Sequence, residues 1–167
     1  MYLNISSASI ISVRLKKFLV LGIIMIQIKV KKIKDNAIIP SYAHDGDAGV
    51  DLYSTEDYLL KPGERVLVST GIKIAIPKGY EAQTRPKSGL ALNKGLSIAN
   101  TPGTIDSGYR GEVGVIAINL GKEDIKIDKG KKIAQMVFNK IEEAEFEEVK
   151  ELDNTKRSEG GFGSTGH

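Results

Sequence analysis

Short apolar runs separated by Gly and Pro recur along the sequence from residue 26 onward. In several runs, such as 72–76, apolar and polar positions alternate with a period of two, which is typical of a strand with one buried face. Many short strands bounded by turn residues predict an all-β sandwich or barrel. The expected strands are Ala48–Tyr53, Arg65–Ser69, Ile72–Ile76, Tyr80–Arg85, Val113–Asn119, Ile125–Ile127 and Ile133–Phe138.

One helix and one ambiguous segment complete the expected pattern. Residues 88–94 predict a helix of one or two turns, because Gly95 follows at the position where helices commonly end. The Glu-rich segment 140–151 has a helix-forming composition, but Ala144 and Phe146 alternate with Glu, and an edge strand fits a β protein better. From Asp153 onward the only apolar core residue is Phe162, which predicts a flexible arm.

The amino-terminal residues differ in composition from the rest of the chain. Residues 1–34 carry seven cations and no acids, beside an apolar run at 18–26. This order resembles a signal peptide, but no small-residue cleavage site follows, and the run is far shorter than the ~20 residues that span a membrane. We expect residues 1–24 to be an extension outside the fold, with Met25 as an alternative start; the alternatives are an accessory strand or helix, or a targeting segment. The expected division is therefore 1–24 extension, 25–152 β domain and 153–167 carboxy-terminal arm.

The composition narrows the possible chemistry. A chain of 167 residues fits one domain, and the lack of Cys excludes disulfides, Cys-bound metals and a thiol nucleophile. The formal net charge of +3 could indicate nucleic-acid binding, but Arg14, Lys16 and Lys17 account for all of it. From Met25 onward 21 cations balance 21 acids, so the charge is no evidence for nucleic-acid binding. We expect a cytoplasmic protein with no stable nucleic-acid binding and no membrane contact.

Two polar segments near strand ends could bind a metal or an anion. Residues 45–56 do not fit a calcium loop, because they lack the oxygen ligand and the Gly that such a loop needs at its fifth and sixth positions. Two interpretations are left: the segment is a polar turn, or Asp51 reaches a metal site from its strand. In Arg85–Ala91, cations, a hydroxyl group and the N–H groups at a helix start could together bind an anion. Alternatively, Ser88 is the N-cap of the helix and the cations are solvated.

Three further segments carry candidate chemistry. In 100–112, Gly and Pro shape a tight loop or hairpin from which Asp106 could position or deprotonate a water, unless its carboxylate only stabilises its own turn. Strand 130–138 carries one amide, Gln135, which must be satisfied by backbone or by ligand if it is buried. The Gly-rich tail after Arg157 cannot be a P-loop, but its backbone amides and Phe162 could fold over a phosphate-bearing ligand.

Taken in order, these segments resemble the five motifs of the trimeric deoxyuridine triphosphatases (dUTPases). The matching segments are 48–53, 85–91, 103–112, 130–138 and 160–166, and the resemblance extends over about residues 25–166. It implies a jelly-roll-like β subunit in a homotrimer with active sites between subunits. It also implies hydrolysis of dUTP to dUMP and pyrophosphate with Mg²⁺.

The resemblance implies a role for each matching residue. Asp106 would hold the attacking water near the α-phosphorus and accept the 3′-hydroxyl, while Tyr109 would pack under the deoxyribose. Asp51 would orient waters on an Mg²⁺ ion that is held mainly by the triphosphate. The residues expected to contact substrate are, for the uracil hairpin, Asn100, Gly103, Thr104 and Ile105; for the phosphates, Arg85, Lys87, Ser88, Gly89 and Gln135; and, from the arm, Arg157, Phe162, Gly163 and Ser164.

One position departs from the usual family pattern. The residue before the second-motif Ser is usually Arg, and here it is Lys87, which keeps the charge but lacks the planar bidentate fork. We expect catalysis to survive, with Arg85 able to share the phosphate contacts. Two other functions remain possible: a dCTP deaminase or bifunctional relative, which shares the fold, and a non-catalytic trimer that binds a protein partner.

Overall fold

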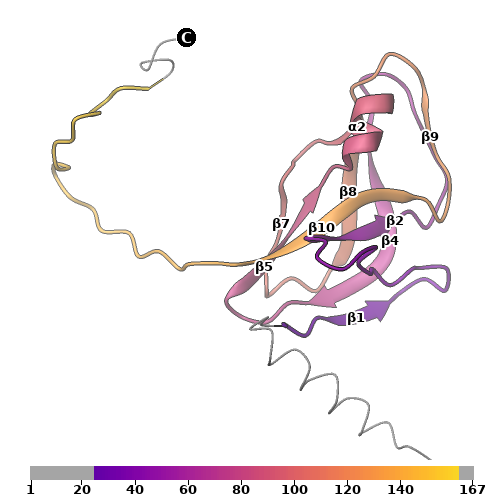
Figure 1. The fold of residues 1–167 in the computed structure, drawn as a ribbon, viewed down its shortest axis with the longest axis horizontal. Coiled ribbons are helices and arrows are strands. Elements are labelled where there is room, and N and C mark those ends of the chain that lie inside the picture. The colour runs from indigo at the N-terminus through magenta and orange to yellow at the C-terminus, as the bar shows by residue number, and fades with distance from the viewer. Residues whose placement is uncertain (1–24, 162–167) are drawn as a thin grey trace, which may run out of the picture.

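Two four-stranded antiparallel sheets face each other in the computed structural model, which describes residues 25–161 (Figure 1). The first sheet has the order β1 (Lys29–Lys32), β4 (Arg65–Ala75), β8 (Glu112–Asn119) and β6 (Leu96–Ile98). The second has the order β2 (Gly49–Tyr53), β10 (Lys132–Lys140), β5 (Tyr80–Arg85) and β7 (Gly103–Ile105). A two-stranded ribbon of β3 (Tyr58–Leu60) and β9 (Ile125–Ile127) completes a jelly-roll-like sandwich.

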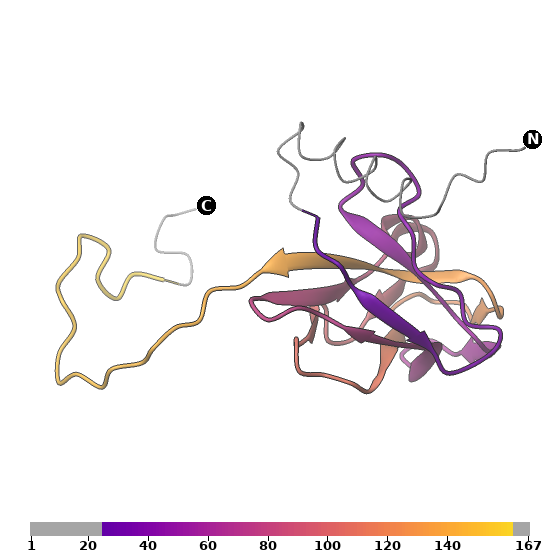
Figure 2. The same ribbon diagram turned by 90° about the horizontal axis from the view of Figure 1, so that it is seen from below.

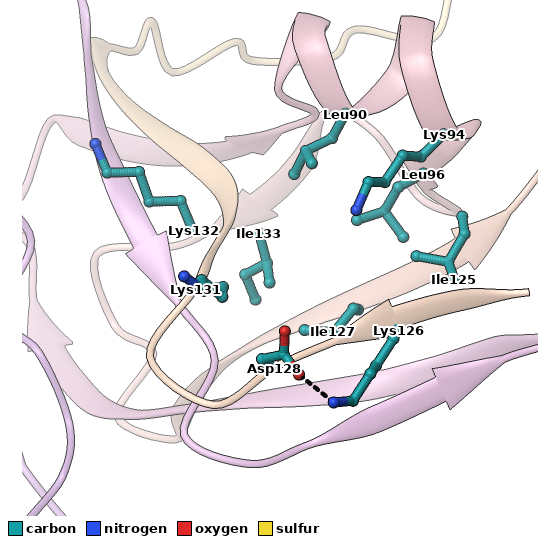
Figure 3. Close-up of a pocket in the computed structure, with 10 residues that line it drawn as sticks. All are labelled: Leu90, Lys94, Leu96, Ile125, Lys126, Ile127, Asp128, Lys131, Lys132 and Ile133. Atoms are coloured by element: carbon teal, nitrogen blue, oxygen red, sulfur yellow. Dashed lines mark ion pairs between the residues drawn. The ribbon is translucent and has the colours of Figure 1, made fainter.

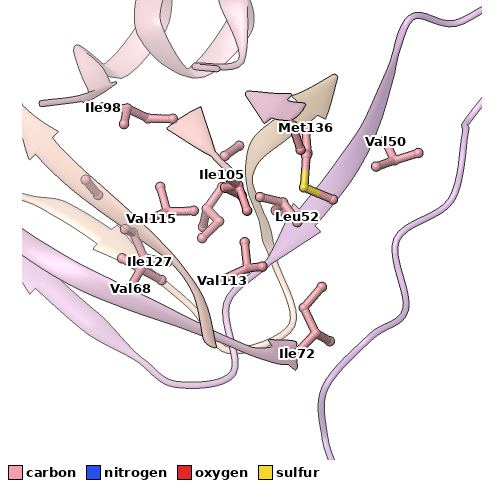
Figure 4. Packing of buried hydrophobic residues seen from close by; sticks show 14 of the residues in the cluster. Val50, Leu52, Val68, Ile72, Ile98, Ile105, Val113, Val115, Ile127 and Met136 are labelled. Atoms are coloured by element: carbon pink, nitrogen blue, oxygen red, sulfur yellow. The ribbon is translucent and has the colours of Figure 1, made fainter. Parts of the chain in front are cut away.

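The core lies between the two sheets and follows the strand alternation (Figure 4). β2 and β10 direct Leu52 and Met136 inward, while β4 and β8 supply Val68 and Val115 from the opposite sheet; each is at most 1% exposed. Because successive residues of a strand point to opposite faces, the polar residues between them lie on the outer faces. Burial of each such apolar side chain stabilises the fold by roughly 1.5–3 kcal/mol.

The all-β prediction with one short helix is confirmed, and most expected strands are present. Tyr80–Arg85 and Ile125–Ile127 have the predicted bounds. The two strands expected at 65–69 and 72–76 are one strand, β4, because a bulge between Ser69 and Lys73 absorbs the Gly71 break without ending the ladder. Three short strands, β3, β6 and β7, were not among the predicted strands.

The helix α2 (Ser88–Lys94) has the expected bounds, and Gly95 ends it in the left-handed conformation at φ 73°. Its amide donates to the carbonyls of Ala91 and Leu90, as the expected helix end requires. The N-cap, however, is Lys87, and no side chain caps the helix. The alternative in which Ser88 is the N-cap is therefore wrong: Ser88 is already the first helical residue.

Among residues 25–161 the last regular element ends at Lys140, and residues 141–161 then extend away from the sandwich (Figures 1 and 2). The edge strand expected within 140–151 is wrong beyond Lys140, since residues 141–151 have no ladder partner within the described part of the chain. Phe146 and Leu152 are 94% and 84% exposed. The Ile141 amide still donates to the carbonyl of Gly79 at 3.1 Å, but residues 142–151 make no backbone hydrogen bond to any described residue, and a strand needs such pairing along its length.

At the other end of the described chain, the strand expected from the alternation of Ile26, Ile28 and Val30 is the edge strand β1, which begins at Lys29. Ile28 and Val30 pack against the core. Between Met25 and Gly161, no helix has the length and apolar character needed to cross a membrane. The division at residues 24 and 152 stays a prediction.

Candidate active site

A row of three polar residues crosses the outer face of the second sheet. Gln135 on β10 lies directly opposite Asp51 on β2 and directly opposite Arg85 on β5. Residues opposite one another in a ladder share a face, so pairing brings together three residues that are far apart in sequence. The Gln135 amide donates to the carbonyl of Pro86 at 3.2 Å, and the Arg85 guanidinium donates to the side chain of Gln83 at 2.7 Å.

Two lysines hold Asp51, one on each carboxylate oxygen. Lys87 donates to Oδ1 at 2.5 Å and Lys132 to Oδ2 at 2.6 Å, while Asp51 itself is only 6% exposed. Burial alone would raise the pKa of Asp51, but the hydrogen bonds from Lys132 and Lys87 outweigh it and hold that pKa below its usual value. The same contact raises the pKa of Lys132. The carboxylate is therefore ionised and fixed at neutral pH.

Ser88 and Gly89 lie in the first turn of α2, directly after Lys87. The Ser88 hydroxyl forms no hydrogen bond with any residue that the structure describes. A Cβ at Gly89 would meet no atom within 4 Å, so the surface beside this turn is open. The structure thus brings Asp51, Lys87, Gln135 and Arg85 together, with the first turn of α2 next to Lys87.

The hairpin residues form a second group around β7. Gly103, Thr104 and Ile105 pair with Thr84, Gln83 and Ala82 of β5, so this strand extends the sheet that carries the polar row. Gly103 is required here, because a Cβ would collide with the Thr84 hydroxyl and crowd the amide of Asn100. Thr104 is exposed, whereas Gly103 and Ile105 are buried.

Asp106 directly follows β7 and is exposed. Its backbone carbonyl accepts from the amide of Tyr109 at 3.1 Å, which closes the turn. Its carboxylate accepts no hydrogen bond from residues 25–161. The alternative in which Asp106 only stabilises its own turn therefore fails: the backbone carbonyl does this, and the carboxylate stays available.

A cavity of about 230 Å³ lies beside this hairpin, lined by Asn100, Tyr109, Glu112 and residues of β4 and β8. Tyr109 is 45% exposed, and its hydroxyl donates to the carbonyl of Glu112 at 3.0 Å. The Glu112 carboxylate accepts from the Ser69 hydroxyl and from the amide of Gly71 at 2.7 Å. Glu112 therefore joins the β4 bulge to the hairpin.

A larger cavity of about 330 Å³ lies between α2 and the start of β10 (Figure 3). Its floor is apolar, with Leu90, Leu96 and Ile133, and lysines stand at its rim. It contains none of the predicted site residues. One of its lining residues, Lys132, directs its amino group away from the other lining side chains, and this is the lysine that contacts Asp51 (Figure 3).

The arm carries the remaining predicted residues. Arg157 is exposed, and its Nε donates to the carbonyl of Gly160 at 2.9 Å. Within the described chain it makes no hydrogen bond or ion pair with either group on the sandwich, and residues 141–161 extend away from that sandwich (Figure 2). Phe162, Gly163 and Ser164 lie outside the described residues.

Two residues of the site were not predicted from the sequence: Lys132 and Glu112. Each belongs to a segment that was singled out, but its contact depends on strand pairing. Lys132 reaches Asp51 because β10 lies against β2, with an irregularity in register between Lys132 and Ala134. No spacing within one segment indicates such a contact.

The side chains that the structure describes could hold a metal ion only together with ligands from outside the protein. Among residues 25–161 no group of three or more His, Cys, Asp or Glu could hold an ion. Mg²⁺ keeps most of its waters and typically takes one or two carboxylates together with substrate phosphates. One carboxylate beside an open, cationic surface fits an ion that a phosphorylated ligand brings with it, and does not fit a metal cage built from protein side chains.

The fold and these two groups of residues define a class of protein, a jelly-roll β-sandwich with two polar sites. One site is a carboxylate–lysine cluster beside a short helix, and the other is a hairpin that lines a cavity and carries an exposed carboxylate. The dUTPase family model matches residues 35–166. The deoxyuridine 5′-triphosphate nucleotidohydrolase of Clostridium tetani is 55% identical over 139 residues, covering 83% of this chain and 96% of that protein. The same enzyme of Clostridium novyi is 59% identical over 137 residues, covering 82% and 96%. The chain belongs to the dUTPase family.

Solved structures agree with this assignment. The dUTPase of Staphylococcus bacteriophage 80alpha, determined with dUPNHPP, superposes with a TM-score of 0.79 at 30% identity, covering 84% of this chain and 99% of that one. The dUTPase of phage phi11 of S. aureus, described as coordinating a structural Mg(II) ion, has a TM-score of 0.72 at 27% identity, covering 77% and 99%.

Proposed function

We propose that this protein hydrolyses dUTP to dUMP and pyrophosphate, as a homotrimer whose active sites lie between subunits. The observation that carries the proposal is the hairpin after β7. Residues 100–112 carry Asp106, which is exposed and whose carboxylate accepts no hydrogen bond from the described residues, and their Asn100 and Tyr109 line a cavity. The similarity to dUTP nucleotidohydrolases over most of the chain gives independent support.

In the proposed reaction, Asp106 holds a water in line with the α-phosphorus and accepts its proton as the water oxygen attacks. The bond from the α-phosphorus to the oxygen that bridges to the β-phosphorus breaks, and pyrophosphate leaves. Phosphoryl chemistry of this kind depends mainly on positioning and charge neutralisation. A chain without Cys and with only two His is therefore adequate.

The polar row and the start of α2 would bind the triphosphate. Gln135 and Ser88 donate hydrogen bonds, Gly89 leaves room for close approach, and Arg85 and Lys87 supply positive charge. Mg²⁺, carried mainly by the triphosphate, would neutralise developing negative charge when it is bound. Asp51 would orient water at that ion, consistent with its ionised and fixed carboxylate.

Uracil and deoxyribose would be recognised at the hairpin. Backbone groups of 100–105 would pair with the edge of uracil, and cytosine would leave buried groups unpaired because its donor pattern differs. Tyr109 would pack under the deoxyribose, where a 2′-hydroxyl collides with the ring.

The arm would complete the site of another subunit. Arg157 would contact the terminal phosphate, Phe162 would stack on uracil, and Gly163 and Ser164 would cover the phosphates as the arm closes. The extension of residues 141–161 away from their own sandwich supports this proposal (Figures 1 and 2). We place the reaction in the cytoplasm, with the nucleotide pool.

A substrate panel tests this function. With Mg²⁺ present, pyrophosphate release should be fast with dUTP and at least a hundredfold slower with UTP, dCTP and dTTP. Ammonia release from dCTP would instead identify a deaminase. Binding of dUTP without pyrophosphate release would indicate a non-catalytic trimer. Light scattering of the purified protein should give three times the subunit mass.

A further inference from the structure

Lys132 stands outside the residues so far given a role, yet it makes one of the two contacts that fix Asp51. Its amino group lies 2.6 Å from Oδ2, and Lys87 lies 2.5 Å from Oδ1. The Asp51 side chain is 9% exposed, the Lys87 side chain 30% and the Lys132 side chain 46%. A single lysine would suffice to neutralise this carboxylate, so the second one requires an explanation.

The two lysines occupy different places in the chain. Lys87 directly precedes the first turn of α2, where Ser88 and Gly89 face open surface. Lys132 begins β10, and its alkyl stem lines the cavity beside α2 while its amino group points out of that cavity (Figure 3). Lys87 therefore directly precedes the turn of α2 that would bind phosphates, and Lys132 does not.

The chemistry of lysine separates the two roles further. A lysine ammonium is a compact point charge on a flexible stem, and it lacks the planar fork with which Arg can serve two anions in fixed geometry. A triphosphate carries more negative charge than a carboxylate, so a bound triphosphate would compete with Asp51 for Lys87. If Lys87 turned to the phosphate, Oδ1 of Asp51 would lose its partner while Oδ2 kept Lys132.

We propose that Lys132 is a positioning residue, which holds the Asp51 side chain in its orientation after Lys87 has moved from Asp51 to the triphosphate. Oδ1 is then free to accept a hydrogen bond from a metal-bound water, while Oδ2 stays anchored. This inference rests on the proposed function of the same site. If Lys132 had a purely structural role, it would only neutralise the charge of the Asp51 carboxylate in the protein without nucleotide.

The experiment measures the Mg²⁺ dependence of nucleotide binding as well as turnover. Non-hydrolysable dUTP analogue is titrated calorimetrically at a series of Mg²⁺ concentrations into wild type, Lys132→Met, Lys132→Arg and Lys131→Met. Lys131 is the matched control, because it is the adjacent lysine of the same turn and contacts no carboxylate among the described residues. Thermal unfolding and subunit mass are recorded for each variant.

Mg²⁺ should enhance analogue binding, and the Mg²⁺ concentration that gives half of this enhancement should be about tenfold higher for Lys132→Met than for wild type. The affinity of this variant for the analogue without Mg²⁺ should change less than threefold. Lys132→Arg should restore the wild-type value within threefold, and Lys131→Met should match wild type. A Mg²⁺ dependence of Lys132→Met within twofold of wild type would overturn the proposal. If the Met variant does not fold, Lys132→Gln is titrated and judged by the same limits. Failure of the proposed function is distinguishable, because wild type itself would then release no pyrophosphate from dUTP, whether or not it binds the analogue.

Discussion

Asn119 offers the sharpest test of how the fold supports the site. It ends β8, is completely buried, and makes three side-chain hydrogen bonds. Its Nδ2 donates to the carbonyls of Leu60 at 2.9 Å and Glu123 at 2.8 Å, and its Oδ1 accepts from the amide of Gly121 at 2.8 Å. The next residue, Leu120, donates to the carbonyl of Gly95, the residue that ends α2. Asn119 thus secures the turn against which the helix carrying Ser88 is held.

Replacing Asn119 by Ala removes all three bonds and leaves two carbonyls and one amide unpaired. A hydrogen bond contributes about 1 kcal/mol net, and an unpaired buried group costs about 1–3 kcal/mol. We therefore expect Asn119→Ala to lower the free energy of unfolding by about 3–5 kcal/mol. Asn119→Asp should lose a similar amount, because a carboxylate oxygen would face two carbonyls.

Urea unfolding followed by circular dichroism gives the measurement, at one protein concentration because subunit association contributes to stability. Asn93→Ala is the control: Asn93 is exposed on α2, and its loss should change the unfolding free energy by less than about 0.5 kcal/mol. A loss below 1 kcal/mol for Asn119→Ala would refute the assignment of these bonds as supports of the turn.

Three further outcomes are expected. Asp106→Asn should lower kcat at least a thousandfold while dUTP-analogue affinity stays within about threefold, measured by pyrophosphate release and calorimetry; near-normal turnover would remove Asp106 from the role of base. Deleting residues 153–167 should abolish most hydrolysis without shifting the unfolding midpoint, and an unchanged rate would contradict closure by the arm. Because the pKa of Asp51 is lowered in the folded protein, its stabilising contribution is complete above the unfolded value of about 4 and is lost as the pH falls through the folded value. The unfolding free energies of wild type and Asp51→Asn, compared without Mg²⁺, should therefore converge below about pH 4; a constant difference from pH 7 to pH 2 would contradict this.

Local patterns predicted much of the framework. The alternation of residues predicted two strands with the observed bounds, and Gly95 predicted the end of α2. Both predictions succeeded because they depend on backbone preferences within a few residues. The pattern of apolar and polar residues predicted the structure wrongly where pairing with another strand decides whether a strand forms. Ala144 and Phe146 alternate with Glu as in a strand, yet residues 142–151 have no backbone hydrogen-bond partner and form no strand within the described chain. Conversely, Gly71 interrupts the apolar pattern, but the ladder between β4 and β8 continues past it through a bulge.

By itself the sequence singled out the candidate residues for chemistry: an Asp in a tight turn, an amide in a buried strand, and cations before a short helix. These follow from residue type and spacing, which need no knowledge of distant neighbours. Only the tertiary structure decided that Gln135 stands between Asp51 and Arg85, that two lysines share one carboxylate, and that Asp106 keeps its carboxylate free. Those facts depend on strand register, and register is fixed by the packing of two sheets around a common core, to which all the strands contribute together.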